Sequence, residues 1–236
     1  MSSSPERSPV PSPVRAPDDG ALPSYDAGSD ARDDPWYGRR GRMSPQRLAD
    51  FTELYVRYGL SGADPLAAWR PATLEIGFGA GESVVDLATA DPITRVLAVD
   101  TFGPGVLALM RGLEAAAIEN VRVARANVLG LLPELPAGQL TLVRIFFPDP
   151  WPKRRHAGRR LLQPDVATRL VELLGSGGVL HYATDSTSYA QDVRALLHGF
   201  DELTPVAPPV RASTRYEAHA LRAGRPVRDL AWRKRA

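Results

Sequence analysis

The sequence contains no cysteine, few histidines and no long apolar run, and each absence excludes a class of protein. Without cysteine the chain forms neither disulfides nor thiolate metal sites, so a reducing cytoplasm is the expected compartment. The four histidines lack the spacing of metal ligands, and we predict no metal site. Apolar stretches are short and interrupted by charge, so no membrane span is expected, and the N-terminus lacks the apolar core of a secretory signal.

Composition indicates a globular protein with one atypical end. The chain has 236 residues, of which 44% are hydrophobic, enough for one α/β domain with an extension or for two small domains. Residues 1–36 are rich in Pro, Ser and Asp and offer few apolar side chains to offset the entropy of ordering. We therefore predict a disordered tail at 1–36 and a single domain at 37–236.

Charge is distributed unevenly along the chain. Residues 1–36 carry seven acidic and three basic side chains, a net charge of −4, so the remaining 200 residues carry +6 of the total of +2. The positive charge gathers at 153–160 and 211–235. Such clusters favour a polyanionic partner, although charge alone is equally compatible with ordinary solvated helix faces.

Apolar strands alternate with helical segments after Trp36. Ser44 is a suitable N-cap, and Pro45 a suitable first residue, for a helix over 44–58. Strands are predicted at the start of 73–83 and at 95–100, 121–127, 139–147 and 177–185. Helices are predicted at 82–90, 105–117, 128–132, 164–174 and 186–199, and a final strand pair at 203–210 and 226–234. This alternation is typical of a Rossmann-like α/β fold, whose mostly parallel sheet of about seven strands has helices on both faces.

Polar residues follow several of these strands. Ligands of open parallel sheets bind outside the carboxyl ends of the strands. We therefore expect one site to be formed by Gly77–Gly81, Asp100, Asn127, Asp149 and Asp185.

The glycine-rich segment LEIGFGAGES indicates a ligand other than a dinucleotide. Gly77, Gly79 and Gly81 lie between a strand and a helix, where glycine permits a tight turn and close approach to a ligand. The third glycine comes one residue too early for the dinucleotide fingerprint, and the Lys-Ser/Thr of a P-loop is missing, so a dehydrogenase is disfavoured. Glu75 would repel a pyrophosphate but suits an ammonium group.

An acidic residue at the end of the next strand completes this pattern. Asp100 is positioned to accept hydrogen bonds from ribose hydroxyls. Together with the glycine loop it resembles the adenosylmethionine-dependent methyltransferases, whose cofactor has a ribose, an adenine and an ammonium but no phosphate. In that fold Asn127 would meet the adenine amino group, or else it only caps the following turn.

The segment FFPDPWPKRRHAGRR (146–160) combines a restrained carboxylate with dense positive charge. Pro148 and Pro150 restrict the backbone on either side of Asp149, which is thereby pre-positioned. Trp151 would stack on a base or form a wall of the pocket. The basic residues suited to neutralising phosphates are Lys153, Arg154, Arg155, Arg159 and Arg160.

This segment, extended to FFPDPWPKRRHAGRRLL, resembles the signature of the bacterial tRNA (guanine-N7)-methyltransferases. Further segments similar to that family are RRGRMSPQ (39–46), LEIGFGAGES, HYATDSTSYA (181–190) and TRYEAHALRAGRPVRDLAW (214–232), so the likeness runs from about residue 37 to the end. The sequence departs from the family pattern at Ser186, where Trp is common, and at Asp100-Thr-Phe102, where Glu-Val-His is usual.

The resemblance implies methyl transfer from S-adenosyl-L-methionine to N7 of guanine 46 in the tRNA variable loop. It implies cofactor contacts from Glu75, Gly77, Gly79, Gly81, Asp100, Asn127 and Asp149, with Asp149 as the catalytic residue. It implies contacts to the tRNA guanosine from Lys153, Asp185, Thr214, Arg215, Tyr216 and Glu217. A cytoplasmic monomer or homodimer is expected.

Guanine N7 bears a lone pair and no proton, so its methylation requires no strong general base. Asp149, assisted by Asp185, would either stabilise the positive charge that develops on the purine or accept from N1–H and the 2-amino group. The sequence leaves both roles open. The guanine is expected to leave its stack to reach the site.

Two other functions remain open from the sequence. Asp149-Pro150-Trp151 is similar to the D-P-P-[YW] motif of methyltransferases that act on exocyclic amino groups, but that interpretation leaves the T-R-Y-E segment unexplained. A non-catalytic RNA-binding protein on a degenerate methyltransferase fold is the other alternative, and the intact glycine loop with Glu75 and Asp100 argues against it.

Overall fold

The computed structural model describes residues 43–60 and 66–236. The tail predicted at 1–36 lies outside the described residues, as does the first half of the segment 39–46.

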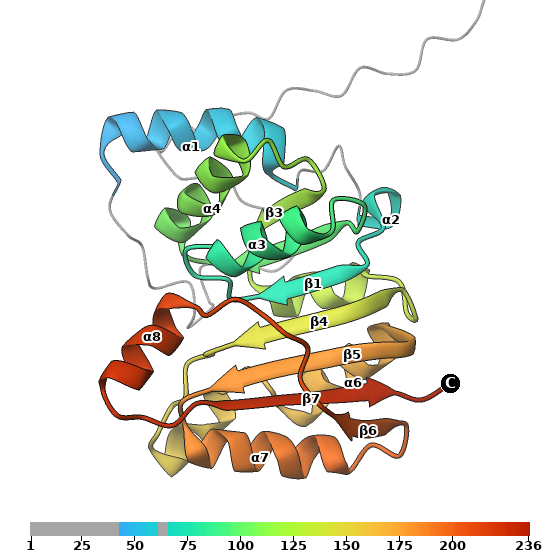
Figure 1. Ribbon diagram of the computed structural model, residues 1–236. Helices are drawn as coiled ribbons and strands as arrows, with labels where there is room; N and C mark the ends of the chain where they lie inside the picture. The colour runs from blue at the N-terminus through green and yellow to red at the C-terminus, as the bar shows by residue number, and fades with distance from the viewer. Residues whose placement is uncertain (1–42, 61–65) are drawn as a thin grey trace, which may run out of the picture.

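Seven strands form one mixed sheet in the order β3-β2-β1-β4-β5-β7-β6 (Figure 1). The strands are β1 (Thr73–Ile76), β2 (Val96–Asp100), β3 (Val121–Arg125), β4 (Leu140–Phe146), β5 (Leu174–Thr184), β6 (Leu203–Val206) and β7 (Arg228–Lys234). Strands β1 to β5 pair in parallel, whereas β7 is antiparallel to both β5 and β6. The predicted α/β fold with a mostly parallel sheet of about seven strands is confirmed.

The longer helices follow the sequence-based expectation within a few residues. They are α1 (Pro45–Tyr58), α3 (Glu82–Ala90), α4 (Gly103–Ala115), α6 (Pro164–Leu173) and α7 (Thr187–His198), with the short α2 (Leu66–Trp69) and α5 (Val128–Leu131). Ser44 caps α1 as predicted, since its hydroxyl accepts a hydrogen bond from the Arg47 amide at 3.4 Å. Four of the described elements were not predicted: the short helix α2, the 3-10 turns η1 (Leu132–Glu134) and η2 (Arg154–Arg159), and the helix α8 (Arg215–Arg222).

Alternating side chains of the strands build two separate apolar layers, one on each face of the sheet. Helices α1, α3 and α4 pack over one face, where Val96, Ala98 and Val123 are buried. Helices α5, α6 and α7 cover the other face, where Leu97, Val99 and other strand residues are buried. Among the described residues, no helix has both the length and the apolar character needed to cross a bilayer.

One half of the sheet carries buried charge in place of apolar side chains. Glu75, Arg144 and His181 are paired in register across β1, β4 and β5, and none is more than 3% exposed. The chain between β6 and α8 crosses in front of these strands and leads to α8 at their carboxyl ends (Figure 1). This half of the sheet therefore supports the C-terminal segment through polar contacts.

Candidate active site

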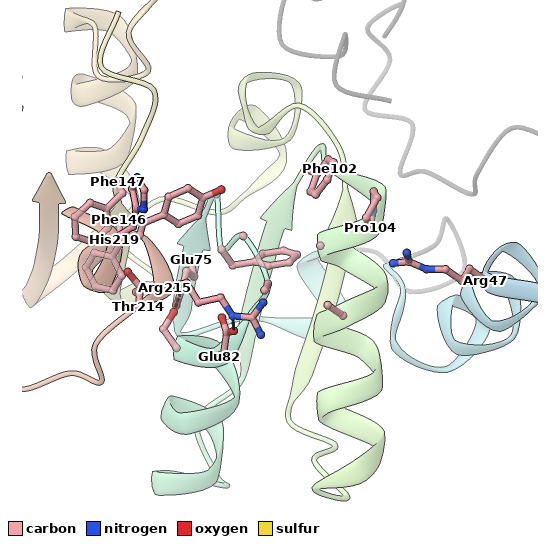
Figure 2. A pocket seen from close by; sticks show the side chains of 18 residues that line it. Arg47, Glu75, Glu82, Phe102, Pro104, Phe146, Phe147, Thr214, Arg215 and His219 are labelled. Carbon is pink, nitrogen blue, oxygen red and sulfur yellow. Dashed lines mark hydrogen bonds and ion pairs between the residues drawn. The ribbon is translucent and has the colours of Figure 1, made fainter. Parts of the chain in front are cut away.

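A cavity of about 490 Å³ lies at the carboxyl ends of β1 and β4. Its walls come from the glycine loop, the first turns of α1 and α4, the end of β4, and α8. Figure 2 shows Phe146, Phe147 and His219 gathered on one side of the glycine loop, and Phe102 and Pro104 on the other. The cavity therefore lies at the sheet edge that the sequence predicted.

The backbone conformation of the glycine loop favours glycine at its first position. Gly77 has φ +73°, a conformation that side chains rarely adopt, and a Cβ added there would project into open space. The loop also packs tightly on α4, because a Cβ on Gly105 would lie 2.2 Å from the Gly79 carbonyl oxygen. The backbone of this loop is thus held against α4, while the space beside Gly77 stays clear.

Glu75 is buried beneath this loop and is only partly neutralised. Ser83 Oγ donates to Glu75 Oε1 at 2.5 Å, and Arg144 Nη1 lies 3.1 Å from Oε2 in an ion pair. Oε2 nevertheless accepts no well-aligned hydrogen bond. Burial raises the pKa of Glu75 above its ordinary value, while Arg144 and the Ser83 hydrogen bond oppose that rise. This carboxylate borders the cavity and retains capacity for a cationic ligand group.

Asp100 fastens the glycine loop to the end of β2. Its Oδ2 accepts from the Gly79 amide at 3.0 Å and its Oδ1 accepts from the Phe102 amide at 2.8 Å. Asn127 Oδ1 accepts from the Leu129 amide at 3.0 Å, so the capping role considered above is present. Both side chains are half-buried next to the site, and neither forms part of the cavity wall.

The loop that carries Asp149 is held in an unusual backbone conformation. Phe147 and Trp151 have φ values of +51° and +39°, which are costly for non-glycine residues. Asp149 lies between them, half-buried and adjacent in sequence to the cavity wall at Phe147. Such strain persists only where surrounding contacts impose it.

One of the contacts that hold the Asp149 loop comes from Arg160, and it corrects the prediction made for that residue. Arg160, expected to neutralise phosphate, is 6% exposed and faces inward. Its Nε donates to the Pro150 carbonyl oxygen at 2.9 Å, and Nη1 forms an ion pair with Asp192. Its guanidinium also lies 4.8 Å from the Tyr189 ring centroid. The physical reason is that these carbonyl and carboxylate groups satisfy the fork of Arg160 inside the fold, so it supports the Asp149 loop.

Other cations of the same segment remain outside. Lys153, Arg155 and Arg159 are exposed. The Arg159 guanidinium lies 5.0 Å from the Trp151 ring centroid, and His156 meets the same indole edge-on at 5.8 Å. The combination of an aromatic ring and exposed cations is suited to a nucleic-acid backbone and bases.

Asp185 and its neighbour have local partners. Asp185 Oδ2 accepts from Arg225 Nε at 2.7 Å, which ties the end of β5 to the chain after α8. Ser186 caps α7, because its hydroxyl accepts from the Tyr189 amide at 3.3 Å. The departure from the family pattern at Ser186 thus places a good N-cap residue at a helix start.

The T-R-Y-E segment forms the start of α8 and closes one side of the cavity. Thr214 Oγ1 accepts from the Glu217 amide at 3.1 Å and caps the helix. Arg215 forms an ion pair with Glu82 at the start of α3. Tyr216 covers the glycine loop so closely that a Cβ on Gly79 would lie 3.1 Å from its ring. The Glu217 carboxylate points instead to Arg211.

The structure brings six of the predicted site residues together in the cavity wall: Glu75, Gly77, Gly79, Thr214, Arg215 and Tyr216. The remaining predicted residues do not line it: Gly81, Asp100, Asn127, Asp149, Lys153, Asp185 and Glu217.

Sequence reasoning also missed Arg47 and His219 in the wall and Arg144 and Arg211 beneath it. A charge inside the apolar run LVRIFF was the available signal for Arg144. Across the described residues, no group of three or more His, Asp or Glu side chains is arranged to hold a metal ion.

The fold and cavity define the class of protein as a Rossmann-like methyltransferase. Solved structures of similar fold include TrmN from Thermus thermophilus, with TM-score 0.51, 18% identity, and coverage of 86% of this chain and 53% of that one. Another is precorrin-6y C5,15-methyltransferase from Geobacter metallireducens, with TM-score 0.50, 15% identity, and coverage of 84% and 92%. A family model described as "Putative methyltransferase" matches residues 69–230. The cofactor of this class is S-adenosyl-L-methionine, as predicted.

The particular family follows from closer relatives. The chain is 41% identical to the tRNA (guanine-N(7)-)-methyltransferase of Halorhodospira halophila, covering 84% of this chain and 93% of the relative. It is 41% identical to that of Streptomyces coelicolor, with coverage of 83% and 79%. It is 37% identical to that of Methylococcus capsulatus, with coverage of 83% and 91%. The chain belongs to the tRNA (guanine-N7)-methyltransferase family, which confirms the resemblance.

Proposed function

We propose that this protein transfers a methyl group from S-adenosyl-L-methionine to N7 of guanine 46 in the variable loop of tRNA, giving 7-methylguanosine. The observation that carries the proposal is the contact of Tyr216 with Gly79. It joins the T-R-Y-E segment, which the family resemblance assigns to the guanosine, to the glycine loop, which it assigns to the cofactor. With these assignments, the donor and acceptor sites would share one cavity.

The residues present fit the cofactor. S-adenosyl-L-methionine supplies an electrophilic methyl group on a sulfonium. Glu75 offers a buried carboxylate oxygen with spare hydrogen-bonding capacity for its ammonium. Gly77 provides a backbone that a ligand can approach closely, and Gly79 and Gly81 complete the turn. Asp100 would accept from the ribose and Asn127 would meet the adenine, in addition to the loop contacts that each already makes.

Asp149 is the proposed catalytic residue. The Asp149 loop is held by Arg160 and flanked by strained residues, so the carboxylate is pre-organised before substrate arrives. Since N7 has no proton to remove, Asp149 would act by offsetting the charge that develops on the purine or by orienting the base. The cavity would exclude water and align N7, which is where most of the acceleration arises.

The remaining predicted contacts belong to tRNA. Lys153, with the exposed Arg155 and Arg159, would neutralise phosphates. The residues proposed to surround the extruded guanosine are Asp185, Thr214, Arg215, Tyr216 and Glu217. The extent of the domain over 37–236, a cytoplasmic setting and a monomeric or homodimeric state remain predictions of the sequence.

The test is methyl transfer from labelled S-adenosyl-L-methionine to unmodified tRNA transcripts, followed by nuclease digestion. The expected product is 7-methylguanosine at position 46, and the label should vanish when that guanine is replaced by adenine. Label on another base, or on protein, would refute the substrate assignment while leaving the methyltransferase fold intact.

Asp149→Asn tests the catalytic assignment. Removing one positioned electrostatic group typically costs about 10²–10³-fold in rate. The variant should retain its circular dichroism spectrum and its affinity for tRNA, but lose that factor in single-turnover methyl transfer. A variant that turns over at the wild-type rate would contradict the role of Asp149.

A further inference from the structure

Arg211 is a buried cation in the chain that leads from β6 to α8. Its side chain is 6% exposed. It precedes the cap residue Thr214 by three positions, and it lies over the half of the sheet that carries buried charge. Neither the cavity wall nor the exposed basic surface includes it. Its hydrogen bonds and ring contacts instead connect α8 with the sheet.

The guanidinium of Arg211 joins α8 to β7. Nη1 lies 2.6 Å from Glu217 Oε2, and Nη2 lies 3.3 Å from Glu217 Oε1. Nε donates to Asp229 Oδ2 at 2.9 Å. Asp229 Oδ1 in turn lies 2.6 Å from Nε2 of the buried His181 on β5. A planar fork with two carboxylate partners fixes their relative position, which a lysine ammonium would not do.

The same guanidinium also supports the end of β4. It lies 4.8 Å from the Phe146 ring centroid and 6.0 Å from that of Phe147. Both rings line the cavity, and Phe147 is the strained residue that precedes Pro148 and Asp149. One side chain thus contacts the segment leading to Asp149 and also the helix whose Tyr216 covers the glycine loop.

Glu217 is engaged by these contacts. Its side chain is 17% exposed, both carboxylate oxygens face Arg211, and its amide is bound by Thr214 Oγ1. This pairing anchors the first turn of α8 to Arg211.

We propose that Arg211 is a positioning residue, which fixes α8 over the cavity through its contacts with Glu217 and Asp229. This inference rests on the proposed function for its kinetic consequences. It leaves in place the substrate contacts that the family resemblance implies for Thr214, Arg215, Tyr216 and Glu217.

A double-mutant cycle of Arg211→Met, Glu217→Gln and the combined variant measures the coupling between these two side chains. Because misplacement by about 1 Å can cost about 10²-fold, we expect Arg211→Met to lower single-turnover methyl transfer by about 10- to 100-fold. Glu217→Gln should lower it by about tenfold alone but by less than about twofold in the Arg211→Met background. An undiminished effect of Glu217→Gln in that background would overturn the proposal.

Hydrogen exchange of the full chain makes the test independent of activity. Arg211→Met should speed amide exchange across 215–222 by at least about tenfold relative to the rest of the protein, because α8 loses its anchor. Arg211→Lys should give an intermediate rate. Unchanged exchange in α8 would overturn the positioning role even if the wild-type protein methylates no tRNA, so failure of the proposed function remains distinguishable.

Arg169 provides a matched control. Its guanidinium donates to the carbonyl oxygens of Leu132 and Leu135 at 3.1 and 2.6 Å, between α6 and the chain around η1, and it takes no part in the cavity wall. Arg169→Met should lower the melting temperature but leave methyl transfer within about twofold of wild type. A fall in rate equal to that of Arg211→Met would show a general loss of packing and contradict the specific role.

Discussion

Two regions of this molecule are rich in arginine and use it in opposite ways. Within η2, the side chains of Arg155 and Arg159 are exposed to solvent. Beneath the cavity, Arg144 and Arg211 are almost completely buried among carboxylates and aromatic rings. Arg160 directly follows η2 in the sequence, but it is buried like Arg144 and Arg211.

The difference shows that a basic segment is not uniform in function. A solvated arginine can exchange water and counterions for phosphate at low cost, so it contributes to affinity for polyanions. A buried arginine is already desolvated and is held by fixed partners, so its loss is felt in geometry and stability. Substitution of an exposed arginine should therefore lower affinity for tRNA, whereas substitution of a buried arginine should lower stability or the rate of methyl transfer.

The largest effect is expected from Arg144→Met. This change leaves Glu75, which is 1% exposed, without its ionic partner. An uncompensated buried charge costs about 3–5 kcal/mol, to be measured as a loss of unfolding free energy in urea. A second substitution, Glu75→Gln, should recover part of that loss. A double variant less stable than the single one would contradict the pairing.

The same variant should become sensitive to pH. Burial already raises the pKa of Glu75 in the folded state, and loss of Arg144 would raise it further. The folded state then binds a proton more tightly than the unfolded one, so stability is greatest below the unfolded pKa of about 4.3 and falls as pH rises toward the folded pKa. Urea titrations at pH 5 and pH 8 would reveal this, and greater stability at pH 8 would refute it.

Arg160→Met should have the next largest effect. It removes hydrogen bonds to the Pro150 carbonyl and to Asp192, but Asp192 is 64% exposed and can regain water. A loss of about 1–3 kcal/mol is expected. Because the Asp149 loop loses its support, kcat should fall more than KM for tRNA rises. Arg159→Met is the adjacent control, and an equal loss of stability there would remove the distinction between buried and exposed arginine.

Thr214→Ala should cost less. It removes the side-chain cap of α8, which is worth about 1 kcal/mol, while leaving the Arg211 contacts intact. Thr214→Ser retains the hydroxyl and should be close to wild type in melting temperature. If alanine and serine behave alike, the cap contributes nothing measurable.

The smallest effect on stability is expected from the triple variant Lys153→Ala, Arg155→Ala and Arg159→Ala. All three side chains are exposed, so unfolding free energy should change by no more than about 0.5 kcal/mol per site. Affinity for tRNA should weaken, and the slope of log affinity against log salt should become shallower by about 0.7–0.9 for each phosphate that is no longer neutralised. An unchanged salt slope would exclude these residues from the RNA interface.

Sequence reasoning located the strands and the edge where the site lies because both follow from local patterns. The carboxyl ends of the first two apolar strands are marked in the sequence by Gly77 and Asp100. Parallel pairing then brings those ends together. Sequence reasoning missed α8, a short and mostly polar helix that buries only Ala220 and is held by the Thr214 cap and by tertiary contacts. It also failed at Arg160, since nothing local distinguishes that residue from Arg159.

The sequence by itself determined the α/β alternation, the glycine loop, the restrained Asp149 and the family, because each depends on particular residue types at fixed spacing along the chain. Only the tertiary structure decided which charges are inside. Glu75, Arg144 and His181 meet because register aligns three strands, and Arg211 reaches Glu217 and Asp229 because the chain crosses the sheet. Burial is a property of the folded surface as a whole, and no single segment specifies it.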